Sequence, residues 1–218
     1  MARTADKLIS DIRKEVSSGI LKPGDQLEVN ALAERFGVSR TPIREAIRTL
    51  VESGVLETRP RKGSFVRVLS AKQLLDLFQV AAELEGMACR LAALSLTKEN
   101  VEAIERGLAK CTKAAEVQNN AEYAMANLDF HTAIHNASGN DWLIEQLRQL
   151  QINLNSYRNM PYEIRGRLKK STDEHKIVCD AILSGDGENA CNLMRDHMML
   201  QGKRLPSIIA TLEQQKNN

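Results

Sequence analysis

Hydrophobic residues recur at intervals of three and four positions through most of the chain, and this spacing predicts a mainly helical protein. The first helix is expected over residues 4–18, and Pro23 and Gly24 then offer a tight turn. A short second helix is expected to end at Phe36, where Gly37 supplies the turn into a third helix. Three short helices are therefore expected to open the chain.

The third expected helix has one apolar face and one basic face. Its apolar positions follow helical spacing and are Ile43, Ala46, Ile47 and Leu50. Arg40, Arg44 and Arg48 recur every four residues, and packing of the apolar face turns them outward. Ser39 stands where a side chain can cap the helix. A basic helix held in this way can enter a groove of DNA.

Two short β-type runs follow, at residues 55–58 and 64–68, and they predict a small hairpin. Pro60 and Gly63 suit the turn between them, and the basic residues at its tip are Arg59, Arg61 and Lys62. A basic tip is either an exposed loop or an arm along the DNA backbone or minor groove, and the neighbouring basic helix favours the arm. Residues 1–69 are thus predicted to form a winged helix-turn-helix.

From Ser70 onward the pattern is helical throughout. Ser70 with Gln73 indicates a capping box at the start of a long helix. Further helix starts are expected at Thr97, Asn120, Asp141, Ser171 and Asp186. Residues 70–218 are therefore predicted to form an all-helical bundle of six or seven helices.

Composition narrows the class of protein. The 218 residues are 43% hydrophobic, which suffices for a core, and no apolar run approaches the roughly 18 residues that span a membrane. A cytoplasmic protein without membrane contact is expected. Residues 1–70 hold 13 basic and 9 acidic side chains, whereas the remainder holds 17 and 19. The positive charge therefore coincides with the predicted DNA-binding region.

Motifs of common enzymes are absent from the sequence. There is no Walker loop, no GxGxxG and no GxSxG, and Thr132 stands where a zinc protease HExxH helix needs its glutamate. The four cysteines form no CxxC pair and are expected to be reduced, buried thiols. The sequence therefore predicts a protein that is not an enzyme.

Three histidines on three expected helices share faces with apolar residues and point inward: His131, His175 and His197. Together with one oxygen donor they can form a metal site open to a ligand. From spacing alone, however, hydrogen-bonded core histidines are the simpler interpretation. His135, one turn after His131, either joins this group or lies on the surface.

The segments GILKPGDQL, LAERFGVSRTPIREAIRTL and RKGSFV resemble the DNA-binding domain of GntR-type bacterial transcription regulators over residues 5–68. The resemblance implies that Arg40 and Arg44 reach into the major groove, where a guanidinium matches the edge of guanine. It also implies that Ser39 and Thr41 bind phosphate and that Gly63 allows close approach of the wing. The full set of candidate DNA-binding residues is Ser39, Arg40, Thr41, Arg44, Arg48, Arg59, Lys62 and Gly63.

Residues 70–210 resemble the helical ligand-binding domain, called FCD, of the FadR-like branch of GntR regulators. The resemblance rests on LEGMACRLAA, NLDFHTAIHNASGN, DEHKIVCDAILSGD and MRDH. Many members of that branch bind a divalent metal, which implies a metal ion here, with zinc as the first expectation. The implied ligands are Asn127, His131, His175 and His197, and His135 is left out. Asp is commoner in the family at the position of Asn127, whose amide carbonyl can coordinate but brings no charge.

Relatives that sense carboxylates often carry an arginine in the first bundle helix, and the matching position here is Ala81. Tyr157 and Arg158 are the alternative effector-binding candidates, although a solvated helix end explains them equally well. The metal itself can also receive an effector carboxylate. The sequence thus predicts a regulator, expected to be a repressor, that responds to a small molecule and binds a palindromic double-stranded operator as a homodimer. The alternatives are a metal-free regulator, an architectural DNA-binding protein whose bundle only dimerises and, less favoured, a metal-dependent enzyme.

Overall fold

The computed structural model describes residues 5–17, 19–158 and 166–199, apart from the side chains of Asn155, Ser156 and Arg158. The described residues fall into two compact units. The first comprises the described residues up to Leu69 together with Gln151–Ser156, and the second comprises Ser70–Leu150 together with the described residues from Tyr157 onward. Each unit has its own arrangement of helices and its own buried side chains.

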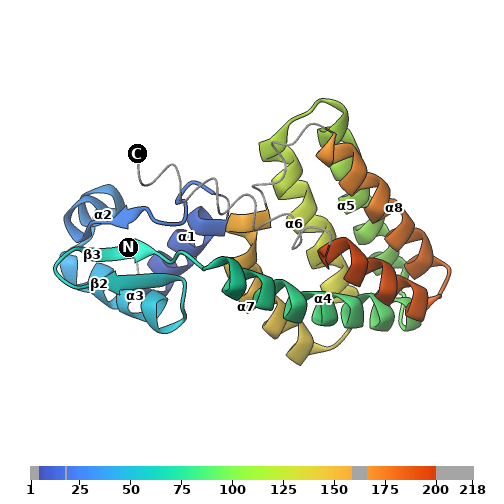
Figure 1. Ribbon diagram of the computed structural model, residues 1–218, viewed down its shortest axis with the longest axis horizontal. Coiled ribbons are helices and arrows are strands. Elements are labelled where there is room, and N and C mark those ends of the chain that lie inside the picture. Colours follow the sequence, from blue (N-terminus) through green and yellow to red (C-terminus); the bar gives the residue numbers. More distant parts are fainter. Residues whose placement is uncertain (1–4, 18, 159–165, 200–218) are drawn as a thin grey trace. The chain divides into compact units, whose positions relative to one another are not determined.

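The first unit contains three helices and a small antiparallel sheet (Figure 1). Its elements are α1 (Ala5–Ser17), β1 (Gln26–Leu27), α2 (Val29–Phe36), α3 (Arg40–Glu52), β2 (Leu56–Arg59) and β3 (Gly63–Val66). The strand order is β1-β3-β2, with Leu27 opposite Ser64 and Leu56 opposite Val66. The predicted hairpin is β2 and β3, whereas the sequence did not predict β1, because two residues are too few to show an alternating pattern.

The core of this unit fixes which face of α3 is exposed. Leu8 and Ile12 of α1 are fully buried, as are Ile43 and Leu50 of α3. Their burial contributes roughly 1.5–3 kcal/mol per side chain to folding. Because α3 buries this face, its arginines lie on the side that remains in solvent.

A tight turn joins α2 to α3 and completes the helix-turn-helix. Gly37 ends α2 with a left-handed φ of 65°, and its N–H donates to the carbonyl of Glu34. A side chain at this position would be strained, so glycine suits the turn. Ser39 occupies the N-cap position of α3, but its side chain makes no capping hydrogen bond.

Six helices follow within the described residues, in agreement with the predicted bundle of six or seven. They are α4 (Ala71–Leu94), α5 (Lys98–Glu116), α6 (Asn120–Ala137), α7 (Asp141–Arg158), α8 (Arg167–Leu183) and the final helix, residues 187–199. In Figure 1, α5 lies beside α6 and α8, and α4 runs across them. None of the helices in the described ranges is long and apolar enough to cross a membrane.

Most expected helix starts are confirmed, and one is wrong. Ser70 forms the predicted capping box, since its hydroxyl accepts from the Gln73 N–H at 3.2 Å and its own N–H donates to the Gln73 side chain at 3.0 Å. However, α8 begins at Arg167, and Ser171 is buried inside that helix. The Ser171–Glu174 spacing resembles a capping box, but Gly166 directly before Arg167 provides the actual start.

Helices α5 and α6 approach each other closely at a glycine. A Cβ atom added to Gly107 of α5 would lie only 2.7 Å from the Cα of Phe130 on α6. Real Cβ atoms do not come this close to a backbone atom, so only glycine allows this packing. The contact fixes α6 next to its central histidine, His131.

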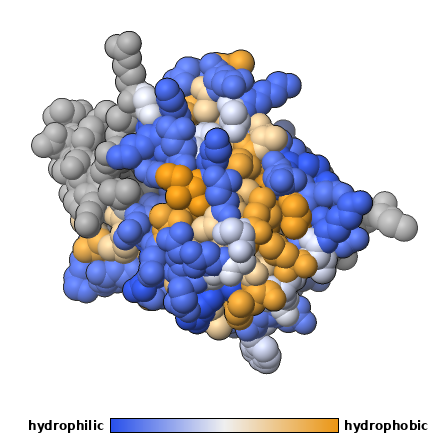
Figure 2. Space-filling view, turned by 90° about the vertical axis from the view of Figure 1, so that its right-hand side faces the viewer, coloured by the Kyte–Doolittle hydropathy of each residue, from blue (hydrophilic) through white to orange (hydrophobic). Residues whose placement is uncertain are grey.

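The surface of the molecule carries hydrophobic patches among hydrophilic side chains, as Figure 2 shows for one face. Among the residues that the structure describes, the second unit exposes the large hydrophobic side chains of Val80, Leu94, Val117, Met125, Trp142 and Ile177. The four cysteines are buried and free, as the sequence predicted. Burial raises the pKa of Cys111 to about 12 and that of Cys179 to about 11, so neither is a nucleophilic thiolate.

Candidate nucleic-acid interface and metal centre

The basic face of α3 presents Arg40 and Arg44 to solvent, opposite the buried Ile43 and Ile47. Neither arginine forms an ion pair with another residue that the structure describes. Their guanidinium groups are therefore available for a partner that offers paired acceptors, as a guanine edge or a phosphate does.

Two other basic candidates are already paired within the unit. The Nε of Arg48 lies 2.9 Å from the Oε1 of Glu52, one helical turn further on. Arg59 in the wing lies 2.6 Å from the carboxylate of Glu57, and its guanidinium stacks 4.3 Å above the ring centre of Phe65. These contacts reduce the charge that Arg48 and Arg59 can offer to DNA.

The remaining candidates lie at the start of α3 and at the tip of the wing. Ser39 and Thr41 are exposed beside the N-terminus of α3, where unpaired N–H groups favour an anion. Lys62 is exposed, and its carbonyl accepts a 2.8 Å hydrogen bond from the side chain of Gln26. Gly63 has a φ of 98°, a conformation that other residues rarely adopt. The tip is thus held in shape while its lysine projects into solvent.

In the second unit all four histidines of the chain are buried. His131 and His135 come from α6, His175 from α8 and His197 from the final helix, and none is more than 2% exposed. The structure therefore decides one alternative that the sequence left open, because His135 is not a surface residue. Four polar rings from three helices lie in one apolar interior.

Three of these rings converge. His131, His175 and His197 each offer a nitrogen, and these nitrogens lie within 4.8 Å of one another. The Nε2 atoms of His175 and His197 are 3.2 Å apart. Two zinc–nitrogen bonds of about 2.0–2.1 Å at a tetrahedral angle place their nitrogens about 3.3 Å apart. The observed separation fits two ligands of one ion, and it also fits a hydrogen bond between the two rings.

Asn127 lies one helical turn before His131 and is only 2% exposed. Its carbonyl oxygen Oδ1 is buried and forms no hydrogen bond with any residue in the described ranges. A buried oxygen without a partner is costly, on the order of 1–3 kcal/mol, and a cation would satisfy it. One oxygen and three nitrogen donors suit a divalent ion such as zinc, so the residues present fit the implied metal.

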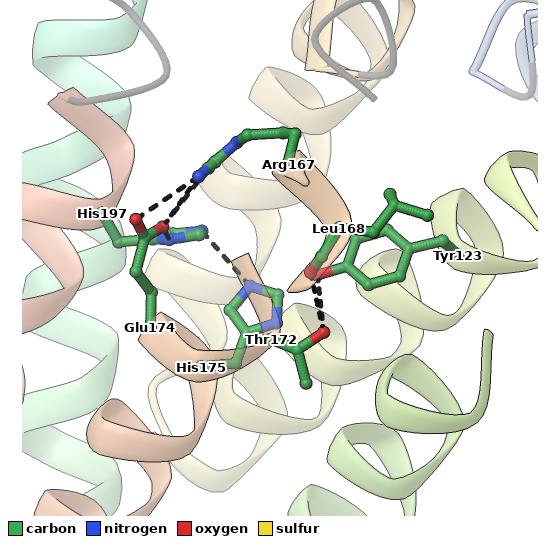
Figure 3. Close-up of polar contacts among 7 residues, drawn as sticks. All are labelled: Tyr123, Arg167, Leu168, Thr172, Glu174, His175 and His197. Atoms are coloured by element: carbon green, nitrogen blue, oxygen red, sulfur yellow. Dashed lines mark hydrogen bonds and ion pairs between the residues drawn. The ribbon is translucent and has the colours of Figure 1, made fainter. Parts of the chain in front are cut away.

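Glu174 lies between His197 and the buried Arg167, as Figure 3 shows. Its Oε2 is 2.7 Å from the Nδ1 of His197 and 3.3 Å from the guanidinium of Arg167. Burial alone would raise the pKa of Glu174, but the contacts with His197 and Arg167 outweigh it and lower the pKa to about 2. A charged carboxylate therefore supports one of the converging histidines.

Glu85 of α4 is a second carboxylate in contact with these histidines, and sequence reasoning did not identify it. It is fully buried, and its Oε2 lies 2.9 Å from the Nδ1 of His131 and 2.9 Å from the Nε2 of His135. A signal was present, because Glu85 shares the apolar face of α4 with Ala81, Ala82 and Cys89 at helical spacing. A charged residue on such a face needs a buried partner.

The candidate effector-binding residues are less well defined. Ala81 stands at the position where carboxylate-sensing members of the resembled family often carry an arginine, and it is fully buried and offers no charge. Tyr157 is also buried, so it is not part of a solvated helix end. The side chain of Arg158 lies outside the described residues. Arg167 is a buried cation of this unit, and it shares the carboxylate of Glu174 with His197.

Two family models match the chain. The model "Bacterial regulatory proteins, gntR family" matches residues 4–66, and the model "FCD domain" matches residues 76–199. Among curated relatives, the "HTH-type transcriptional regulator McbR" of Escherichia coli K12 is 29% identical over 210 residues, which cover 95% of this chain and 92% of that protein.

Two further similarities agree with this result. The "Probable D-xylose utilization operon transcriptional repressor" of Paenarthrobacter nicotinovorans is 30% identical over 184 residues, which cover 84% of this chain and 80% of that protein. The solved structure of E. coli McbR/YncC has a TM-score of 0.81 to this chain at 28% identity, and the match covers 99% of this chain and 100% of that one.

Proposed function

This chain belongs to the GntR family of bacterial regulatory proteins and carries an FCD domain, and we propose that it is a metabolite-responsive repressor with a metal centre in that domain. The family and the relatives above are transcription regulators, so the chain is a DNA-binding regulator and not an enzyme. In this proposal residues 1–69 bind the operator in the bacterial cytoplasm, and residues 70–218 bind the effector and dimerise.

Operator recognition is assigned to α3. Arg40 and Arg44 are exposed and lack an ion-pair partner among the described residues, so each can donate two hydrogen bonds to a guanine. Ser39, Thr41 and Lys62 would bind phosphates, and Gly63 would let the wing approach the backbone. A homodimer with two-fold symmetry would present two copies of α3 to a palindromic operator.

The metal centre is assigned to Asn127, His131, His175 and His197. The observation that carries this assignment is the pair of Nε2 atoms 3.2 Å apart next to a third histidine, with a buried amide oxygen one turn away. When bound, a zinc ion would supply a Lewis acid that can receive a carboxylate of the effector. The protein's own residues hold the rings in place and exclude water.

An effector would regulate the protein by binding one arrangement of the dimer more tightly than another. The spacing of the two α3 helices would then differ between the two arrangements, and operator affinity would change. The relative from Paenarthrobacter nicotinovorans is named as a probable repressor, which supports release of DNA by the effector here. Tyr157 and Arg158 remain the proposed effector-binding side chains.

One preparation of the purified full chain tests both assignments. Elemental analysis is expected to find about one divalent ion per chain, and selection from random DNA is expected to yield a short palindrome. Arg40→Ala is compared with the wild type in both measurements, since it removes an exposed side chain of the operator-binding face and leaves the core unchanged. If a palindrome is selected but no ion is found, the chain is a metal-free regulator. If an ion is found but no DNA sequence is preferred, the operator assignment is contradicted.

A further inference from the structure

We propose that Glu85 is a positioning residue that fixes the tautomers of His131 and His135 and so determines which of these two rings binds the metal. The inference rests on the metal centre proposed above. It assigns a role to Glu85, which the sequence did not identify, and a role to His135, which was left out of the implied metal ligands.

The geometry constrains the protons. A single oxygen, Oε2 of Glu85, lies 2.9 Å from both His131 Nδ1 and His135 Nε2. With Glu85 ionised, its carboxylate accepts hydrogen bonds and does not donate them, so each facing ring nitrogen carries a proton. His131 is therefore the Nδ1–H tautomer, and His135 is the Nε2–H tautomer. The opposite tautomers would turn lone pairs toward a fully buried negative charge.

The tautomers separate the roles of the two rings. His131 keeps its Nε2 lone pair for coordination, and its ring belongs to the convergent set with His175 and His197. His135 lies outside that set and forms a second possible metal-binding group with Glu85 and His131. Since its Nε2 proton is engaged by Glu85, His135 serves as a hydrogen-bond donor and not as a metal ligand.

Glu174 provides an internal parallel. It faces the same ring nitrogen, Nδ1, of His197 at 2.7 Å, so the Nε2 of that ring is left to face His175. Both carboxylates thus orient a metal-binding histidine from behind, a pattern known to raise ligand basicity and hold the ring. They differ in their second donor, which is Arg167 for Glu174 and His135 for Glu85. His135 therefore donates to Glu85 in the way that Arg167 donates to Glu174.

Two measurements on the full chain test the assignment. Long-range proton–nitrogen NMR correlations of protein labelled with ¹⁵N-histidine report each tautomer at pH 8, where ordinary imidazoles are neutral. Metal-free wild-type protein is expected to show Nδ1–H for His131 and Nε2–H for His135. In Glu85→Gln, zinc affinity measured by chelator competition is expected to fall about 10- to 100-fold, and the His131 and His135 signals are expected to change.

Glu83→Gln is the matched control, because Glu83 lies on the same helix but is exposed and pairs with Arg195. Its zinc affinity is expected to equal that of the wild type. An Nε2–H tautomer at His131, or a folded Glu85→Gln variant with unchanged zinc affinity, would overturn the proposal. If Glu85→Gln does not fold, the tautomers measured in the wild-type protein still test the proposed role of Glu85. Failure of the wild type to bind zinc would contradict the proposed metal centre, while the tautomers of the metal-free protein would still test Glu85 separately.

Discussion

The basic face of α3 and the histidine cluster of the FCD domain hold their polar groups in opposite environments. Arg40 and Arg44 are exposed and have no ion-pair partner among the described residues. His131 and His197 are buried, and each faces a carboxylate within 2.9 Å. The basic face of α3 therefore depends on a binding partner to pair its charges. The histidine cluster already has its supporting hydrogen bonds within the protein, before any ion binds.

This difference predicts different responses to mutation and to solvent. Exposed charges contribute little to folding, so changing them alters binding and leaves stability nearly unchanged. Buried and connected groups affect binding and stability together. The following predictions test this contrast, beginning with the largest expected effect.

Salt is expected to separate the two regions most strongly. If a dimer neutralises six to ten phosphates, operator affinity should fall about 10³- to 10⁵-fold between 50 and 200 mM salt. Zinc affinity should change far less, because the cluster is buried and screened little by ions. Parallel titrations of DNA and zinc over the same salt range measure both, and a flat salt response of DNA binding would falsify the electrostatic account of α3.

His175→Ala is expected to weaken zinc binding by more than about 100-fold, since loss of a ligand should exceed the usual loss of a supporting residue. The variant should also be less stable, because His175 is fully buried and its ring centre lies 4.6 Å from that of Phe130. Elemental analysis and thermal unfolding of the same sample measure both effects. His135→Ala is the control, and it should keep one ion per chain; full metal content in His175→Ala would exclude the proposed site.

Arg44→Ala is expected to cost about 1–3 kcal/mol of operator affinity and to relax specificity at one base pair. Its free energy of unfolding should stay within about 0.5 kcal/mol of wild type, because the side chain is exposed. Binding to a panel of single-base operator variants measures the specificity. Equal weakening for every sequence would reassign Arg44 to a phosphate contact.

Arg48→Ala is expected to have the smallest effect, less than about 1 kcal/mol on operator binding, although it lies on the same face as Arg44. The carboxylate of Glu52 lies 2.9 Å from Arg48 and offsets the positive charge that this side chain offers to DNA. Comparison of Arg44→Ala and Arg48→Ala on one operator tests whether the internal pair matters. Similar losses for both would show that Arg48 exchanges Glu52 for DNA.

Local signals explain what the sequence predicted well. The apolar spacing of α3 and the Ser70–Gln73 capping box depend on residues within one or two turns, so both could be read directly. The start of α8 was wrong for a related reason, because Ser171 and Glu174 imitate a cap inside a helix that begins at Arg167. A local pattern alone cannot separate a real cap from its imitation.

The support of the proposed metal centre depends on contacts that are distant in sequence. Glu85 meets His131 and His135, which lie 46 and 50 residues away, and only the packing of α4 against α6 brings them together. The inward direction of His131 could be predicted from its helix face. The carboxylate behind it could not be assigned, since helical spacing shows that Glu85 is buried but not which partner it meets.

Gly107 has a consequence for how this centre can change. Because the backbones of α5 and α6 touch beside Phe130, the place of His131 is set by main-chain packing from a helix that supplies no ligand. Even one added methyl group at Gly107 would push α6 and move the ring away from its two neighbours. A substitution at Gly107 would therefore disturb the site by displacing α6. Asn127→Asp would instead change the charge of the site while the helices stay in place, so metal preference can change at Asn127 and not at Gly107.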